Sequence, residues 1–112
     1  MKFSKDRRQI ILTEITLDKS FISFGDFAWE QEQKVEFVLT NIGVNLLVID
    51  NINTSCGCIT VDYIREPVRP GYTLLLNVTY KAEYAEHFDK TITIYCNVKD
   101  SPFQLKVTGN AK

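Results

Sequence analysis

Apolar and polar residues alternate along almost the whole sequence with a period of two, and this pattern limits the fold more than any other feature. In residues 91–96, one parity carries Ile92, Ile94 and Cys96, and the other carries two threonines and a tyrosine. Successive side chains of a strand point to opposite faces, so such a segment buries one face and exposes the other. We find no long segment with a helical period. The sequence therefore predicts an all-β domain.

Strands are expected wherever turn residues bound this alternation. The clearest are 35–40, 46–52, 74–80, 88–96 and 103–107, with shorter ones at 15–17, 21–24 and 59–61. Turns are expected at Asn41-Ile42-Gly43, Pro70-Gly71 and Asp100-Ser101-Pro102, because these residue types supply the backbone angles of turns. About seven short strands result, the number expected of an immunoglobulin-like antiparallel β-sandwich. The last two strands are predicted to form a terminal hairpin.

Size and charge exclude several classes of protein. A chain of 112 residues with 45% hydrophobic content suits one domain, since a second would lack a core. Thirteen basic and fourteen acidic residues give a net charge of -1, which provides no general field for nucleic acid. The longest apolar runs, 46–49 and 74–76, are far shorter than the roughly 20 residues of a membrane span. We expect no nucleic-acid partner and no membrane insertion.

The start of the chain stands apart from the sandwich predicted for residues 15–112. Residues 1–14 are expected to form an N-terminal arm or an extra edge strand, because their charged start fits no alternating strand. Only Ile10, Ile11 and Leu12 are apolar in succession, which is too short for the apolar region of a signal peptide. The chain is then cytoplasmic unless a leader has been removed.

Four short motifs carry a resemblance to a known family. They are Phe24-Gly25-Asp26, Leu39-Thr40-Asn41-Ile42-Gly43, Thr54-Ser55-Cys56-Gly57-Cys58 and Pro67-Val68-Arg69-Pro70-Gly71. In order and spacing they resemble the bacterial family called domain of unknown function 1573, from about Ile15 to the carboxyl end. The resemblance implies an immunoglobulin-like fold akin to Hydin and major sperm protein type domains, which bind proteins or build assemblies, and it implies no reaction. Members are common in Bacteroidetes, often behind signal or lipoprotein peptides, which favours the periplasm or cell envelope.

Cys56-Gly57-Cys58 is the sharpest chemical feature of the sequence. Glycine lets the loop curl, so the two thiols can converge. They are then able to bind copper or zinc, with His87 or Cys96 as a further ligand, or to oxidise to a disulfide. The alternative is structural, with one cysteine packed as a small hydrophobe and Gly57 serving the loop. We favour the structural interpretation and keep the other two.

The remaining candidates are weaker. Cys96 shares parity with Ile92 and Ile94, so it is expected to face the core, with pairing to Cys56 or Cys58 as the alternative. His87 has no nucleophile motif beside it, and we expect no catalytic residue. Trp29 is a binding candidate if exposed, although folding back over the sandwich is favoured.

Together these observations predict a non-catalytic protein-interaction or structural module of the bacterial cell envelope. Its protein partner would bind at sheet edges or at the loop that contains Ser55, Cys56, Gly57 and Cys58. One alternative is a metal-binding or thiol-redox protein that uses this loop. A second is a carbohydrate-binding module that uses Trp29 with Tyr63, Tyr72 or Tyr84. No cofactor is expected apart from the copper or zinc of the first alternative.

Overall fold

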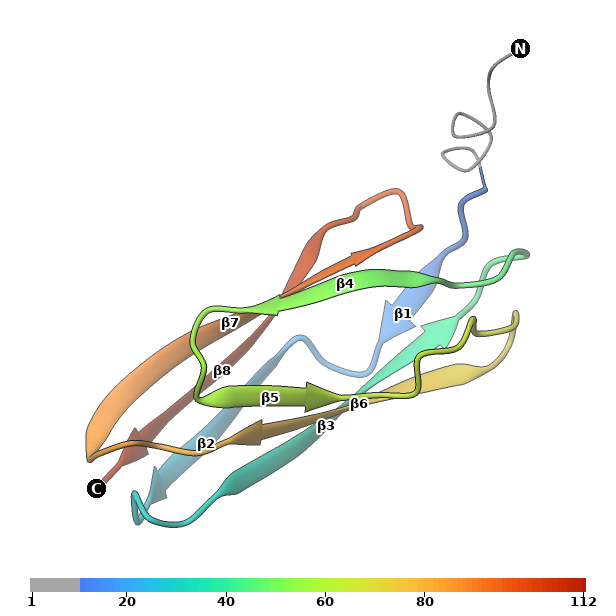
Figure 1. The fold of residues 1–112 in the computed structure, drawn as a ribbon. Helices are drawn as coiled ribbons and strands as arrows, with labels where there is room; N and C mark the ends of the chain where they lie inside the picture. Colours follow the sequence, from blue (N-terminus) through green and yellow to red (C-terminus); the bar gives the residue numbers. More distant parts are fainter. Residues whose placement is uncertain (1–10) are drawn as a thin grey trace.

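A computed structural model describes residues 11–112 of the chain, and this part forms eight strands in two packed sheets (Figure 1). The strands are β1 (Ile15–Leu17), β2 (Phe21–Phe27), β3 (Gln33–Asn41), β4 (Ile49–Thr54), β5 (Ile59–Asp62), β6 (Thr73–Tyr80), β7 (Glu86–Cys96) and β8 (Phe103–Ala111). The prediction of an all-β immunoglobulin-like sandwich is confirmed. Within residues 11–112, no helix is long and apolar enough to span a membrane.

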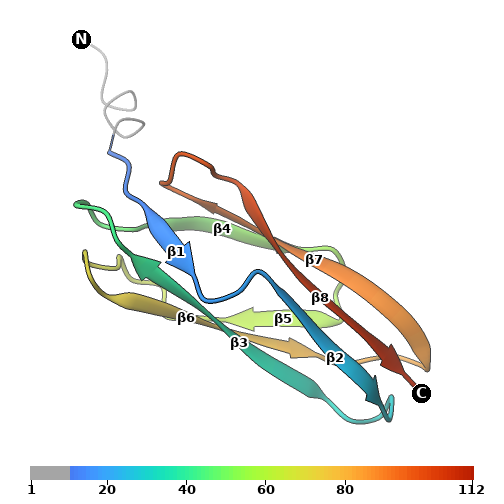
Figure 2. The ribbon, with the colours of Figure 1, turned by 180° about the vertical axis from the view of Figure 1, so that it is seen from behind.

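Each sheet has four strands. One has the order β1-β3-β6-β5 and the other β2-β8-β7-β4 (Figure 2). The eight strands agree with the expected number of about seven, whereas one pair, β2 with β8, is parallel and was not expected. The chain crosses between the sheets directly after β1, so β2 lies on the opposite sheet beside the last strand. An alternating pattern records which face is buried and carries no information on which neighbour a strand selects.

The core lies between the sheets and follows the predicted alternation. Phe37 and Leu39 of β3, Leu76 of β6 and Ile92 of β7 are fully buried, and the residues between them face outward. Towards one end, the rings of Tyr80 and Phe88 stack with centroids 3.8 Å apart. Burying a large apolar side chain contributes about 1.5–3 kcal/mol, so this layer supplies most of the stabilisation.

Two predicted turns form. The carbonyl of Arg69 accepts a hydrogen bond of 3.0 Å from the backbone N–H of Tyr72, and Gly71 between them has φ +87°. This is a type II turn, in which proline suits the second position and glycine the third. The last hairpin joins β7 to β8 through a turn with a cis Ser101–Pro102 peptide bond, where the Ser101 hydroxyl accepts a hydrogen bond of 2.9 Å from Cys96 N–H.

The first described residues already belong to the sandwich. Thr13 is only 4% exposed, it forms a bridge with Val98, and its N–H donates to the carbonyl of Asn97 at 2.9 Å. Of the arm predicted for residues 1–14, residues 1–10 lie outside the part of the chain that the structure describes.

Candidate functional site

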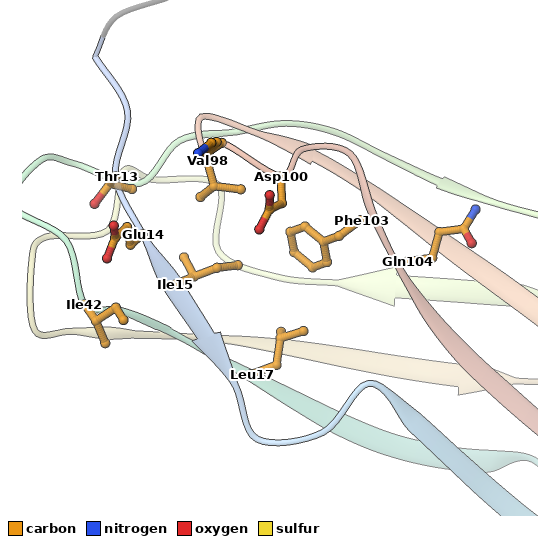
Figure 3. A pocket seen from close by; sticks show the side chains of 10 residues that line it. Thr13, Glu14, Ile15, Leu17, Ile42, Val98, Asp100, Phe103 and Gln104 are labelled. Atoms are coloured by element: carbon orange, nitrogen blue, oxygen red, sulfur yellow. The ribbon is translucent and has the colours of Figure 1, made fainter.

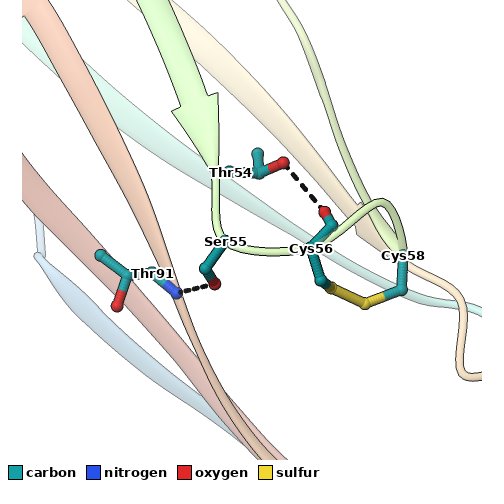
Figure 4. The surroundings of a disulfide bond; sticks show 5 residues. All are labelled: Thr54, Ser55, Cys56, Cys58 and Thr91. Carbon is teal, nitrogen blue, oxygen red and sulfur yellow. Dashed lines mark hydrogen bonds between the residues drawn. A yellow bond between two sulfur atoms is a disulfide. The ribbon is translucent and has the colours of Figure 1, made fainter.

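The two cysteines of the Cys56-Gly57-Cys58 loop are joined by a disulfide (Figure 4). The loop connects β4 to β5, and these strands belong to different sheets, so the disulfide lies where the chain crosses the sandwich. The Cα atoms of the two cysteines are 5.4 Å apart, which is within the usual range for a disulfide. The Thr54 hydroxyl donates a hydrogen bond of 2.9 Å to the carbonyl of Cys56. The loop is therefore a closed covalent ring.

Hydrogen bonds tie this ring to both sheets. On one side, Ser55 N–H donates to Thr91 O at 3.0 Å. Thr91 N–H in turn donates to the Ser55 hydroxyl at 2.9 Å, which is drawn as a dashed line in Figure 4. On the other side, Lys81 N–H, directly after β6, donates to Cys58 O at 3.0 Å. Ser55, Cys56, Gly57 and Cys58 are thus held in place by contacts that do not involve the sulfur atoms.

A ring this small stabilises the fold only slightly. Closing a loop of three residues removes unfolded-state entropy worth about 1.6 kcal/mol, compared with about 3 kcal/mol for fifteen residues. The chain-entropy contribution of the disulfide is therefore at the lower end of the usual range. The small stabilisation does not affect the ability of the disulfide to react with thiols.

The predicted metal site would use the sulfur atoms of Cys56 and Cys58, which form the disulfide in this structure. A soft metal needs thiolate ligands, and a disulfide offers none. Within residues 11–112 there is no group of three or more His, Cys, Asp and Glu side chains placed to hold a metal ion. His87, the predicted third ligand, lies on β7 four residues before Thr91, which is about 13 Å along an extended strand. The structure does not bring His87 together with Cys56 and Cys58.

Cys96 faces the core, as its parity predicts, and it is a free thiol. It is 5% exposed, and burial raises the pKa of its thiol to about 11. A protonated, buried thiol is a poor nucleophile and a poor metal ligand. The alternative pairing of Cys96 with Cys56 or Cys58 is not adopted.

The aromatic candidates for carbohydrate binding are spread over the molecule. The side chain of Trp29 is half-buried and packs against the core, and its backbone N–H donates to the carbonyl of Lys112 at 3.0 Å. Tyr72 and Tyr84 are exposed, but they lie beyond opposite ends of the eight-residue strand β6, roughly 25 Å apart. Tyr63 is half-buried beside the guanidinium of Arg65. These rings do not form one platform.

A second feature, which the sequence did not indicate, is an open seam between β1 and β8. A groove runs between the two sheets here, and Ile15 and Leu17 of β1 face Phe103 of β8 across it (Figure 3). Its other walls come from Ile42 and from the turn after β7. The seam exists because β2 begins at Phe21, opposite Lys106, and leaves the first part of β8 without an outer neighbour.

The residues that match a known family span nearly all of this architecture. The model of a protein family of unknown function, DUF1573, matches residues 15–111. The chain belongs to the DUF1573 family. No catalytic family is indicated by this match, and no curated protein matches the sequence.

Solved structures similar to this DUF1573 chain share its fold at low sequence identity. A protein of unknown function from Porphyromonas gingivalis W83 has a TM-score of 0.79 and 20% identity, over 88% of this chain and 47% of that one. The ASH or PapD-like domain 7 of human CEP192 has a TM-score of 0.76 and 8% identity, over 90% and 87%. WR4, a major sperm protein family member of C. elegans, has 0.56 and 11%, over 89% and 99%. The chain spans about half the length of the Porphyromonas protein.

In the DUF1573 fold, two of the family-like motifs meet at Asn41, a residue that the sequence indicated only as part of a turn. Asn41 is completely buried, and its side-chain nitrogen donates hydrogen bonds of 2.8 Å to the carbonyls of Asn45 and Val68. Its side-chain oxygen accepts from the Thr13 hydroxyl and from Gly43 N–H. The sequence signal for this role is that Asn41 is a polar residue at a position where the alternation of β3 predicts burial. A buried amide must be hydrogen-bonded, so such a residue is expected to join several segments.

Proposed function

We propose that this DUF1573 domain is a non-catalytic interaction module that binds an extended segment of a partner protein along the seam between β1 and β8. The observation that carries the proposal is the groove between β1 and β8, which combines apolar walls with strand edges that have no neighbour among residues 11–112. Such edges accept an added strand through backbone hydrogen bonds, and side-chain pockets then provide specificity.

The free backbone groups are identified by the pairing of β1. The Glu14 carbonyl accepts from Ile42 N–H at 2.8 Å, and Asp18 N–H donates to Val38 O at 3.1 Å. Backbone groups alternate in direction along a strand, so the N–H and C=O of Ile15 and Leu17 point away from β3. They form the outer edge of β1 beside the groove.

A matching edge lies across the seam on β8. Lys106 N–H donates to Ser20 O at 2.9 Å, on the side where β2 lies. Gln104, two residues earlier, turns its backbone groups to the same side, and β2 does not extend far enough to reach them. A strand in the groove therefore meets hydrogen-bonding groups from both sheets.

The side chains of the groove define the partner segment. Ile15, Leu17 and Phe103 are half-buried and leave apolar surface in the groove, whereas Glu14, Lys99 and Asp100 lie on its lining with both signs of charge. A partner strand that alternates apolar and polar residues would bury its apolar side chains against Phe103 and leave its polar side chains in water. The proposed partner is thus an extended, alternating segment of a protein.

Our proposal places the domain in the bacterial cell envelope. The support is the disulfide of Cys56 and Cys58, since disulfides persist in oxidising compartments, together with the signal or lipoprotein peptides that the family resemblance implies. Fractionation of the source cells tests this part. Recovery of the protein in the cytosolic fraction would contradict it.

Site-specific photocrosslinking tests the binding site. A photoreactive phenylalanine analogue replaces Gln104 at the groove in one variant, and Lys34, exposed on β3, in a matched control. The proposal predicts that a discrete partner crosslinks through position 104 in living cells and not through position 34. Equal crosslinking at both positions, or crosslinking at position 34 alone, would reject the seam as the binding site.

A further inference from the structure

The disulfide loop has properties that a structural crosslink does not need. It closes only three residues, and hydrogen bonds from both sheets hold the loop independently of the sulfur atoms. From this arrangement we propose that Cys56 and Cys58 form a thiol–disulfide exchange site, whose substrate is a dithiol oxidoreductase. This site lies on the β4–β5 connection and does not depend on strand binding at β1 and β8.

The loop is accessible to an attacking thiolate. Ser55 and Gly57 are exposed, and both cysteines pack against the core but are only half-buried, so the disulfide loop is partly accessible from solvent. A Cβ added at Gly57 would meet no atom within 4 Å, so the space beside the loop is open. Exchange requires approach of a thiolate to one sulfur, and access is one of the factors that set its rate.

The hydrogen bonds that hold the loop allow the exchange to be reversible. When the S–S bond is cleaved, the paired hydrogen bonds between Ser55 and Thr91 remain, and Lys81 N–H still holds the carbonyl of Cys58. Both ends of the short loop are therefore fixed in the reduced state, and the two thiols stay close. A reduced pair held together in this way can be oxidised again without refolding of the domain.

The chemical steps balance as two electrons and two protons. A thiolate of the external dithiol attacks one sulfur of the Cys56–Cys58 bond, forms a mixed disulfide and releases the other cysteine as a thiolate, which takes up a proton. The second thiol of the reductant then loses its proton and attacks the mixed disulfide, which releases the remaining cysteine. The products are two thiols in this domain and one disulfide in the oxidoreductase.

Cys96 provides an internal control for accessibility. It is buried, and the hydrogen bond from its N–H to the Ser101 hydroxyl lies within the β7–β8 hairpin. A reagent that reaches Cys56 and Cys58 in the folded domain must not reach Cys96. Labelling of Cys96 would report unfolding instead of exchange at the loop.

The test uses the intact chain in native buffer. The protein is incubated in mixtures of reduced and oxidised glutathione, with and without a bacterial dithiol oxidoreductase. Samples taken over time and at equilibrium are trapped with N-ethylmaleimide and weighed by mass spectrometry. The proposal predicts that two maleimides add as the mixture becomes more reducing and that the oxidoreductase accelerates the reaction at least tenfold. Circular dichroism is expected to stay unchanged, with a third maleimide added only in denaturant.

Two variants separate exchange from structure. Cys58→Ser leaves Cys56 without its partner, so oxidised glutathione is expected to form a stable mixed disulfide at Cys56. Cys56→Ser/Cys58→Ser is the control and gains no mass. A disulfide that resists reduction until denaturant is added, simultaneous labelling of Cys96, or absence of the mixed disulfide in Cys58→Ser would each overturn the proposal.

Discussion

The hydroxyl of Thr13 donates a hydrogen bond of 2.7 Å to the side-chain oxygen of Asn41, which lies 28 residues further along the chain. Both residues are buried. The amide of Asn41 also fixes the carbonyls of Asn45 and Val68, so one side chain connects the entry to β1, the end of β3 and the segment before β6. This end of the sandwich, where the groove between β1 and β8 opens, is organised by Asn41.

Replacement of this amide should be strongly destabilising. In Asn41→Ala, the buried Thr13 hydroxyl and the part-buried carbonyl of Asn45 lose their partner, and the carbonyl of Val68 keeps only the hydrogen bond from Leu47 N–H. We expect the free energy of unfolding to fall by about 3 kcal/mol, because buried unsatisfied groups cost about 1–3 kcal/mol each. Urea denaturation measures the change. Asn53→Ala, at an exposed position of β4, is the control and should stay within about 0.5 kcal/mol of the parent.

Two glycines in neighbouring family-like motifs should respond differently to the same substitution. A Cβ at Gly43 would meet the Thr13 hydroxyl and lie 2.5 Å from the backbone nitrogen of Glu14, so the backbone must move. We expect Gly43→Ala to lose about 1–3 kcal/mol of stability, as overpacking does. Gly57→Ala meets no atom within 4 Å and should be nearly neutral. Equal thermal stabilities of the two variants would contradict this account.

The sequence was sufficient for the fold class and for several local features. The type II turn at Pro70-Gly71 and the inward direction of Cys96 depend on local chemistry, which the sequence states directly. The parallel pairing of β2 with β8 and the open seam depend on which sheet each strand joins, and residue periodicity does not carry that information. Asparagine is common in turns, so the sequence indicates Asn41 only as a turn residue, and its burial reveals the second role.

Asp18 should give the protein a measurable pH dependence. Its carboxylate is hydrogen-bonded by the Lys19 side chain and by Val38 N–H, and these donors lower its pKa below the ordinary value of 3.8. A lowered folded-state pKa means that the stabilisation is present above the unfolded-state pKa and is lost as the pH falls through the folded-state pKa. Asp18 is partly exposed, so the effect should be under about 1 kcal/mol.

The measurement compares Asp18→Asn with the parent by thermal unfolding across a pH series. The parent should have the higher Tm at neutral pH, and the difference should shrink as the pH falls below 3.8. Asp50→Asn, at an exposed position of β4, serves as the control. A difference in Tm that stays constant with pH would show that Asp18 acts only through its shape and hydrogen-bonding pattern.

Leu17 offers a direct test of strand binding at the seam. Its N–H points away from β3, so Leu17→Pro removes a donor at the free edge without breaking the ladder of β1 and β3. Leu17→Ala keeps the donor and loses a comparable amount of apolar packing. With the partner identified through position 104, we expect Leu17→Pro to bind about tenfold more weakly than Leu17→Ala, since one backbone hydrogen bond is worth about 1 kcal/mol or more. Urea denaturation establishes that both variants are folded, and equal affinities would exclude backbone pairing at this edge.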